Sequence, residues 1–183
     1  DQEDHDISEL QPAIEQALEE SRQTEIEEPV VDNTPQEDLP RGIRNNNPGN
    51  IERMDTSWNG MSDEQSDSRF INFESPEYGI RAMARILRNY QRRYSINTIE
   101  GIVSRWAPSG ENDVGSYVKH IEDITGINGN QIIDLNDSQI LSSIMKAMIA
   151  HENGISDYYS DDVINRGIEM ESSKGMVTAR GLE

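Results

Sequence analysis

Two glutamates have surroundings suited to acid catalysis. Glu152 stands at the end of an apolar stretch that includes Met145, Met148 and Ile149. Apolar surroundings keep a carboxyl group protonated, so that it can donate its proton to a leaving oxygen. Glu111, in PSGEND, is the rival candidate, on a loop that precedes a helix. Each glutamate also has a purely structural explanation. Glu152 could lie beside apolar residues by chance at the end of its helix. Glu111 could be an acid in the first turn of the next helix that interacts with the helix dipole.

Other chemistries lack their residues in this sequence. The chain contains no cysteine, which excludes thiolate nucleophiles, disulfides and cysteine-ligated metals. It also lacks the Gly-x-Ser-x-Gly pattern of a serine hydrolase. His120 and His151 do not stand at metal-ligand spacing with acidic residues. The sequence therefore predicts neither a metal site nor a cofactor.

The segment RNNNPGN, residues 44–50, offers amide side chains that suit either a turn or a sugar. Asparagines close turns, Pro48 fixes one backbone dihedral, and Gly49 can adopt a positive one. Amides also hydrogen-bond sugar hydroxyls and N-acetyl groups, which makes Asn46, Asn47 and Asn50 candidate substrate contacts. Trp58 is a candidate for stacking on a sugar ring, with burial in the core as its alternative.

Helices must position these residues, because apolar side chains recur at helical spacing over most of the domain. The pattern predicts helices over residues 78–94, 98–108, 112–126, 136–154 and 160–170. Thr98 should cap the second, and Gly154 should end the fourth. Short strands are expected at Asn50–Arg53 and Arg69–Phe73. The predicted fold is mainly α, an α+β domain with a small β excursion.

Charge divides the chain into an acidic arm and an ordinary domain. Residues 1–40 hold fourteen Asp or Glu and one base, Arg22, for a charge of −13, so the remainder of the −19 total is −6. We expect an arm with a helix over 1–22, a flexible acidic linker over 23–40, a domain over 41–170 and a tail over 171–183. An arm of this charge is repelled by phosphate, which argues against nucleic-acid and membrane partners.

Four blocks of the domain carry a family resemblance: RGIRNNNPGNI, GIRAMARIL, RWAPSGEND and KAMIAHENG. From Arg41 to Gly154 the chain resembles phage-derived domains with a lysozyme-like fold. The resemblance implies a hydrolase or lytic transglycosylase that cleaves the glycan strands of peptidoglycan. The AHENG setting of Glu152 is similar to the ESG setting of the catalytic glutamate in glucosaminidase and transglycosylase relatives. In those relatives the helix with the glutamate precedes the turn-rich region, whereas here it follows, so the resemblance implies a circularly permuted order. Two facing carboxylates would favour direct hydrolysis, and a solitary acid a transglycosylase-like mechanism.

The arm contains PAIEQALEES, in which Ile14, Ala17, Leu18 and Ser21 share one narrow helical face. This face, bordered by acids, resembles a ubiquitin-interacting motif. The resemblance implies that these residues bind the apolar patch of ubiquitin, although Pro12 departs from the motif. A solvated arm, or a helix that packs on its own domain, is the alternative.

Two functions follow from these resemblances. The first is a phage enzyme that cleaves peptidoglycan, located in the virion or the periplasm. The second is a secreted bacterial effector that works in the host cytosol, where its repurposed domain binds or processes ubiquitin chains. The sequence lacks the residues that cysteine-dependent and metal-dependent deubiquitinases use. An activity on ubiquitin chains would therefore depend on Glu111, Glu152 or residues of the groove.

Overall fold

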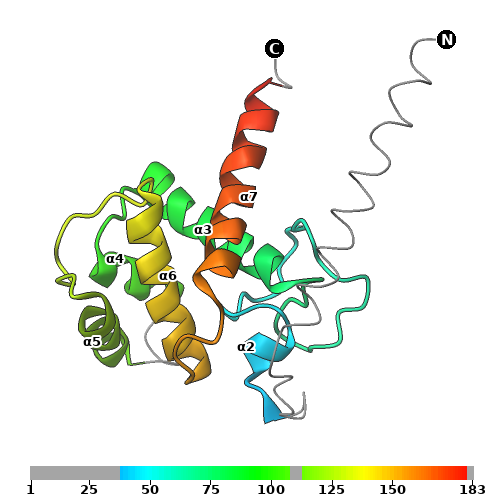
Figure 1. The fold of residues 1–183 in the computed structure, drawn as a ribbon, viewed down its shortest axis with the longest axis horizontal. Coiled ribbons are helices and arrows are strands. Elements are labelled where there is room, and N and C mark those ends of the chain that lie inside the picture. The colour runs from blue at the N-terminus through cyan, green and yellow to red at the C-terminus, as the bar shows by residue number, and fades with distance from the viewer. Residues whose placement is uncertain (1–37, 108–112, 181–183) are drawn as a thin grey trace, which may run out of the picture. The chain divides into compact units, whose positions relative to one another are not determined.

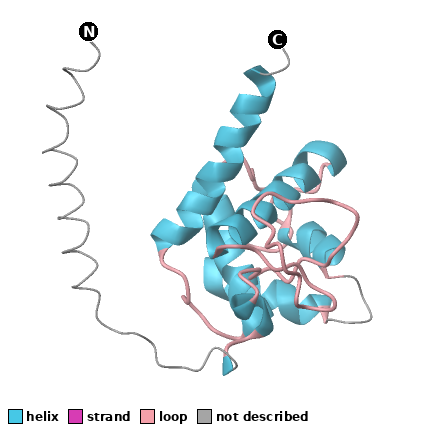
Figure 2. Cartoon of the chain, turned by 90° about the vertical axis from the view of Figure 1, so that its right-hand side faces the viewer, coloured by secondary structure: helices cyan, strands magenta, loops and turns pink. Residues whose placement is uncertain are grey.

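The computed structural model describes residues 38–107 and 113–180, with side chains described as far as residue 173. Helices joined by loops make up this part of the chain (Figures 1 and 2). In chain order the helices are α2 (Arg41–Arg44), α3 (Pro76–Tyr94), α4 (Ile99–Trp106), α5 (Val114–Thr125), α6 (Ser138–Asn153) and α7 (Asp161–Arg180). The expectation of a mainly α fold is confirmed.

Local signals in the sequence fix the helix ends. The Thr98 hydroxyl accepts a hydrogen bond from the Gly101 N–H and begins α4. Asp137 caps α6 by accepting bonds from the N–H groups of Gln139 and Ile140. Gly154 ends α6 in the left-handed conformation, with a φ of 69°. The predicted cap at Thr98 and the predicted end at Gly154 are confirmed, because each depends on a residue within one turn of the helix end.

Helix α7 is longer than the apolar pattern predicts, and it continues to Arg180 past the expected start of a tail at 171. Glu171, the first residue of that expected tail, is buried. Its carboxylate forms an ion pair with Arg88 of α3 at 2.6 Å. A charged contact with α3 therefore holds this part of α7, which an apolar pattern does not reveal.

One main core joins the helices. Helix α3 packs against α7 and α6, while α5 packs against α6 and α4. The fully buried side chains of this main core include Ile80, Met83, Leu87, Ile99, Ile102, Ile121, Leu141, Ile144 and Met145. Burial of each such side chain is worth about 1.5–3 kcal/mol. A smaller core of Ile71, Phe73 and Ala82 lies under the loop between α2 and α3.

The β excursion is smaller than expected. Within the described residues, isolated antiparallel bridges at Glu52–Phe70 and Met61–Phe73 take the place of the predicted strands. The backbone does pair around the first bridge, since the Arg53 N–H donates to the Arg69 carbonyl and the Ile71 N–H to the Ile51 carbonyl. The Phe73 N–H instead donates to the Asn45 carbonyl, which ends the pairing.

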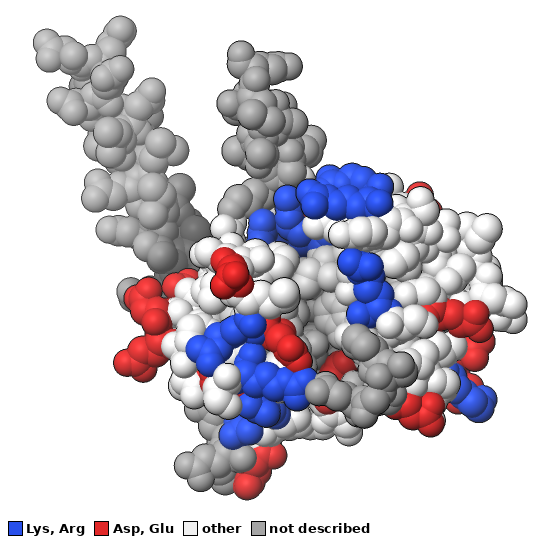
Figure 3. All heavy atoms as spheres, turned by 180° about the vertical axis from the view of Figure 1, so that it is seen from behind, with Lys and Arg blue, Asp and Glu red and all other residues white. Residues whose placement is uncertain are grey.

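The surface carries both signs of charge. Basic and acidic side chains lie in several separate groups over the face shown in Figure 3. Among the described residues, no helix is both long enough and apolar enough to span a membrane.

Candidate functional site

Glu152 lies in the last turn of α6, where three other elements meet it. The Asn50 amide donates a hydrogen bond to its Oε2 at 3.3 Å, from the loop that follows α2. The Tyr117 hydroxyl donates to its Oε1 at 3.2 Å, from α5. The Trp106 side chain, at the end of α4, also acts on the carboxylate as a donor and lowers its pKa. The structure thus surrounds the predicted acid with donors that carry no charge.

Burial raises the pKa of the Glu152 carboxyl above its ordinary value, because a buried carboxylate loses its hydration. The hydrogen bonds from Asn50, Tyr117 and Trp106 stabilise the charged form and offset part of this rise. Since the three donors are neutral, they orient the carboxyl group without fixing its charge as an arginine would. This is the environment of a carboxyl group that can hold a proton and release it.

Asn153, the neighbour of Glu152, fixes α6 to the loop that carries Asn50. Its amide donates to the Pro48 carbonyl at 2.8 Å and to the Ile149 carbonyl at 2.9 Å. Gly49 lets this loop approach closely, since a Cβ there would lie 2.8 Å from both the Met83 Cγ and the Trp106 Cζ2. The loop and the helix end are therefore held together beside Glu152.

The asparagines of the loop have different roles. Asn47 is fully buried, and its amide bonds the Ile51 N–H and the Ile51 and Ile71 carbonyls. This geometry gives Asn47 a structural role, with no polar atom left for a ligand. Asn46 has a φ of 52° and donates to the Phe73 carbonyl at 3.1 Å. Of the three predicted sugar contacts, Asn50 is the one that touches Glu152.

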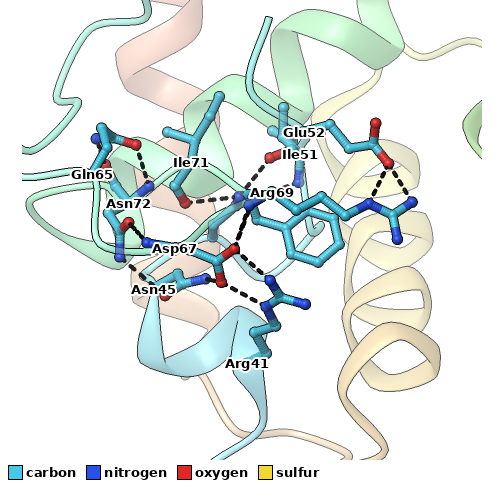
Figure 4. A network of polar contacts seen from close by, with 11 residues as sticks. Arg41, Asn45, Ile51, Glu52, Gln65, Asp67, Arg69, Ile71 and Asn72 are labelled. Atoms are coloured by element: carbon cyan, nitrogen blue, oxygen red, sulfur yellow. Dashed lines mark hydrogen bonds and ion pairs between the residues drawn. The ribbon is translucent and has the colours of Figure 1, made fainter.

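Asp67 anchors the loop from its other side (Figure 4). Arg41 donates to it through Nε at 2.6 Å and Nη2 at 2.5 Å, and the Asn45 amide donates at 2.9 Å. The Asp67 side chain is only 7% exposed. The hydrogen bonds from Arg41 are the main cause that holds the pKa of Asp67 well below its usual range. Sequence reasoning missed this network, although Arg41 and Asn45 both belong to a block quoted above.

Tyr117 links Glu152 to a pair of histidines. It is fully buried, and its ring stacks on the His151 ring with 3.8 Å between centroids. The His151 Nδ1 lies 3.0 Å from the His120 Nδ1, so one ring must donate and the other accept. Burial, followed by the influence of His120, lowers the pKa of His151. No group of three or more possible metal ligands occurs among the described side chains.

The tryptophans differ in their relation to the site. Trp58 is partly buried against the small core of Ile71, Phe73 and Ala82. Trp106 is partly buried against the main core and meets the Tyr90 ring edge-on. Trp106 rather than Trp58 influences the pKa of Glu152, so it is the tryptophan that lies near the predicted acid.

Other predicted site residues lie outside the described part of the chain. Glu111 is one of them. The face of Ile14, Ala17, Leu18 and Ser21 is another, and ubiquitin binding stays a prediction.

Comparison with known proteins places the chain in a family with a phage member. Protein P5 of Pseudoalteromonas phage PM2 is 44% identical over 132 residues, which cover 70% of this chain and 80% of Protein P5. The chain belongs to the family of this phage protein, in agreement with the predicted phage origin. No family model matches the sequence.

Proposed function

We propose that the domain has a lysozyme-like fold and cleaves the glycan strands of peptidoglycan, with Glu152 as the general acid. The observation that carries this proposal is the environment of Glu152, a partly buried carboxyl group with a raised pKa and neutral hydrogen-bond donors. Cleavage of a glycosidic bond requires a proton on the leaving oxygen, and a carboxyl group of raised pKa supplies it.

The first step transfers the Glu152 proton to the glycosidic oxygen while the bond from that oxygen to the anomeric carbon breaks. The electron pair of this bond leaves with the oxygen, and positive charge develops on the sugar ring. Asn50 and Tyr117 hold the two carboxylate oxygens, and their hydrogen bonds strengthen as Glu152 becomes charged. Glu152 then regains a proton, either from the group that attacks the ring or, where a second carboxylate takes that proton, from solvent water.

The attacking group distinguishes two products. If a second carboxylate such as Glu111 activates a water molecule or forms a covalent intermediate, the product is a hydrolysed strand. If Glu152 works alone, a hydroxyl of the sugar itself attacks and leaves an anhydro sugar at the new end, as in a lytic transglycosylase. Glu152 donates the proton to the leaving oxygen in every case.

Membership in a family with a phage protein supports this substrate. A bacterial virus meets peptidoglycan when it enters a cell and again when its progeny leave. A ubiquitin-directed activity would require the eukaryotic cytosol, and the family gives it no comparable support.

The test is digestion of purified peptidoglycan by the full chain, with mass spectrometry of the released fragments. Glu152→Gln should lower the rate by about 10²–10⁴-fold, the usual contribution of a general acid. Glu100→Gln, an exposed glutamate in the first turn of α4, is the matched control and should retain the wild-type rate. Equal activity of Glu152→Gln and wild type would refute the proposal.

The same digestion addresses Glu111. If wild type releases a hydrolysed product and Glu111→Gln does not, Glu111 is the second carboxylate. If wild type and Glu111→Gln both release the anhydro product, Glu152 is the solitary acid.

A further inference from the structure

A surface pocket of about 440 Å³ lies away from the residues that contact Glu152. The loop before α3 contributes Asn59, and α3 itself contributes Tyr78 and Arg81. Helix α7 contributes Arg166, Glu169 and Met170. The pocket therefore forms where α7 packs on α3, and it combines an aromatic ring and a thioether with charged groups.

Arg81 is the unusual residue of this pocket. It is 5% exposed, yet no hydrogen bond or ion pair joins its guanidinium to the described residues. A buried charge normally has a partner, because loss of hydration without compensation costs several kcal/mol. Burial is the main cause that lowers the pKa of Arg81, which reflects this missing compensation. Arginine nevertheless keeps its charge in proteins.

The acids near Arg81 do not neutralise it. Glu171 attracts Arg81 through space, but its carboxylate bonds Arg88 at 2.6 Å and pairs with Arg85 at 3.6 Å. Arg85 in turn repels Arg81. Glu169 lines the pocket as an exposed side chain, opposite in charge to Arg81 and Arg166. Among the side chains that the structure describes, two cations and one anion therefore line the pocket, which leaves one net positive charge.

We propose that this pocket binds a carboxylate carried on an apolar group, with Arg81 as the principal contact. The single net positive charge matches a monoanion better than a dianionic phosphate, which Glu169 would repel. The planar guanidinium matches a carboxylate, since two parallel N–H donors meet its two oxygens. The Tyr78 ring and Met170 provide apolar surface for the group that bears the charge.

Two sources supply this chemistry, a small free carboxylic acid and the C-terminal carboxylate of a peptide. NMR titration of the full chain distinguishes them with two pairs of probes: N-acetyl-leucine against N-acetyl-leucinamide, and a short apolar peptide with a free C-terminus against its amidated form. We expect chemical shift changes around Asn59, Arg81 and Arg166 with the free carboxylates and none with the amides. Equal binding of the amides, or no change with any carboxylate at millimolar concentration, would overturn the proposal. Inorganic phosphate that binds more tightly than both carboxylates would overturn the choice of ligand.

Variants separate a ligand-binding Arg81 from a structural one. Arg81→Met keeps an unbranched apolar chain but removes the charge, and it should weaken carboxylate binding about tenfold or more. Its melting temperature should equal or exceed that of wild type, because the substitution removes a buried charge without a partner. A large fall in melting temperature would assign Arg81 a structural role and refute the proposal.

Arg166→Gln provides a second test that does not depend on a buried position, since Arg166 is exposed. It should weaken carboxylate binding less than Arg81→Met does. Arg92→Met, on an exposed part of α3 where Arg92 bonds Asn89, should bind as wild type does. Wild-type affinity in both pocket variants would contradict the assignment. These measurements do not depend on cleavage of peptidoglycan, so either proposal can fail without the other.

Discussion

Gly42→Ala tests how α2 and the loop that follows it, which carries Asn47 and Asn50, contact the end of α6. An ideal Cβ on Gly42 would lie 2.5 Å from the Asn153 Oδ1 and 2.9 Å from the Asn47 carbonyl oxygen. It would also lie 2.9 Å from the Asn50 Oδ1. Such contacts are closer than a methyl group tolerates, and Asn153 cannot turn away without loss of its hydrogen bonds to Pro48 and Ile149. The new methyl group must therefore separate the loop from α6.

The sign of the stability change makes this test informative. In an open helix, alanine in place of glycine stabilises a protein by about 1 kcal/mol. Overpacking at a close contact costs about 1–3 kcal/mol, and a disturbed hydrogen bond of Asn153 adds about 1 kcal/mol. The net expectation is a destabilisation of about 2 kcal/mol. For a chain of this size, that change lowers the melting temperature by about 4–8 °C.

Thermal and urea unfolding measure this change, with Gly115→Ala as the control. Gly115 is exposed in the first turn of α5, and its nearest contact for a Cβ is the Asp113 Oδ1 at 3.4 Å. The control substitution should leave stability unchanged or raise it slightly. If Gly42→Ala is as stable as Gly115→Ala, the close packing of α2 against Asn153 is wrong.

Three further changes test the electrostatics. Asp67→Asn should lower the stability near neutral pH, since it weakens the pair with Arg41. Because folding lowers the pKa of Asp67, the difference in stability from wild type should shrink as the pH falls below about 4. Glu152→Gln should raise the melting temperature at neutral pH and not at low pH, because folding raises the pKa of Glu152 and stability is lost as pH rises through it. Tyr117→Phe removes the hydrogen bond to Glu152 that lowers the pKa of this glutamate. The pH at which the cleavage rate falls should therefore be higher in Tyr117→Phe than in wild type. An unchanged dependence of the rate on pH would contradict the influence of Tyr117 on Glu152.

The helices were predictable because their signals are local. The apolar face of α3 and the caps at Thr98 and Asp137 lie within the segments that they define. The short strands were predicted on the same basis, but strand pairing depends on a partner. Phe73 bonds to Asn45, which lies beyond the expected pair of strands, and a local pattern cannot reveal this competition.

The candidate site was predictable only in its central residue. The apolar helix drew attention to Glu152, whereas its partners lie far away in sequence, with Asn50 separated by 102 residues and Tyr117 by 35. Tyr117 stands on the buried face of α5, where its pattern is that of a core residue. His120 and His151 meet because α5 packs on α6, and their spacing in sequence gave no sign of it.

The backbone of Asn50 explains why so many contacts hold its loop. Its φ of 50° is a left-handed conformation, which costs a residue other than glycine about 1 kcal/mol or more. Asn47, Asn153 and the Asp67 network each bond the surrounding segments without touching the Glu152 carboxylate. They compensate for the strain at Asn50 and so keep its amide on Glu152. The protonation of the proposed acid therefore depends on the packing of a polar loop as well as on the apolar helix that carries it.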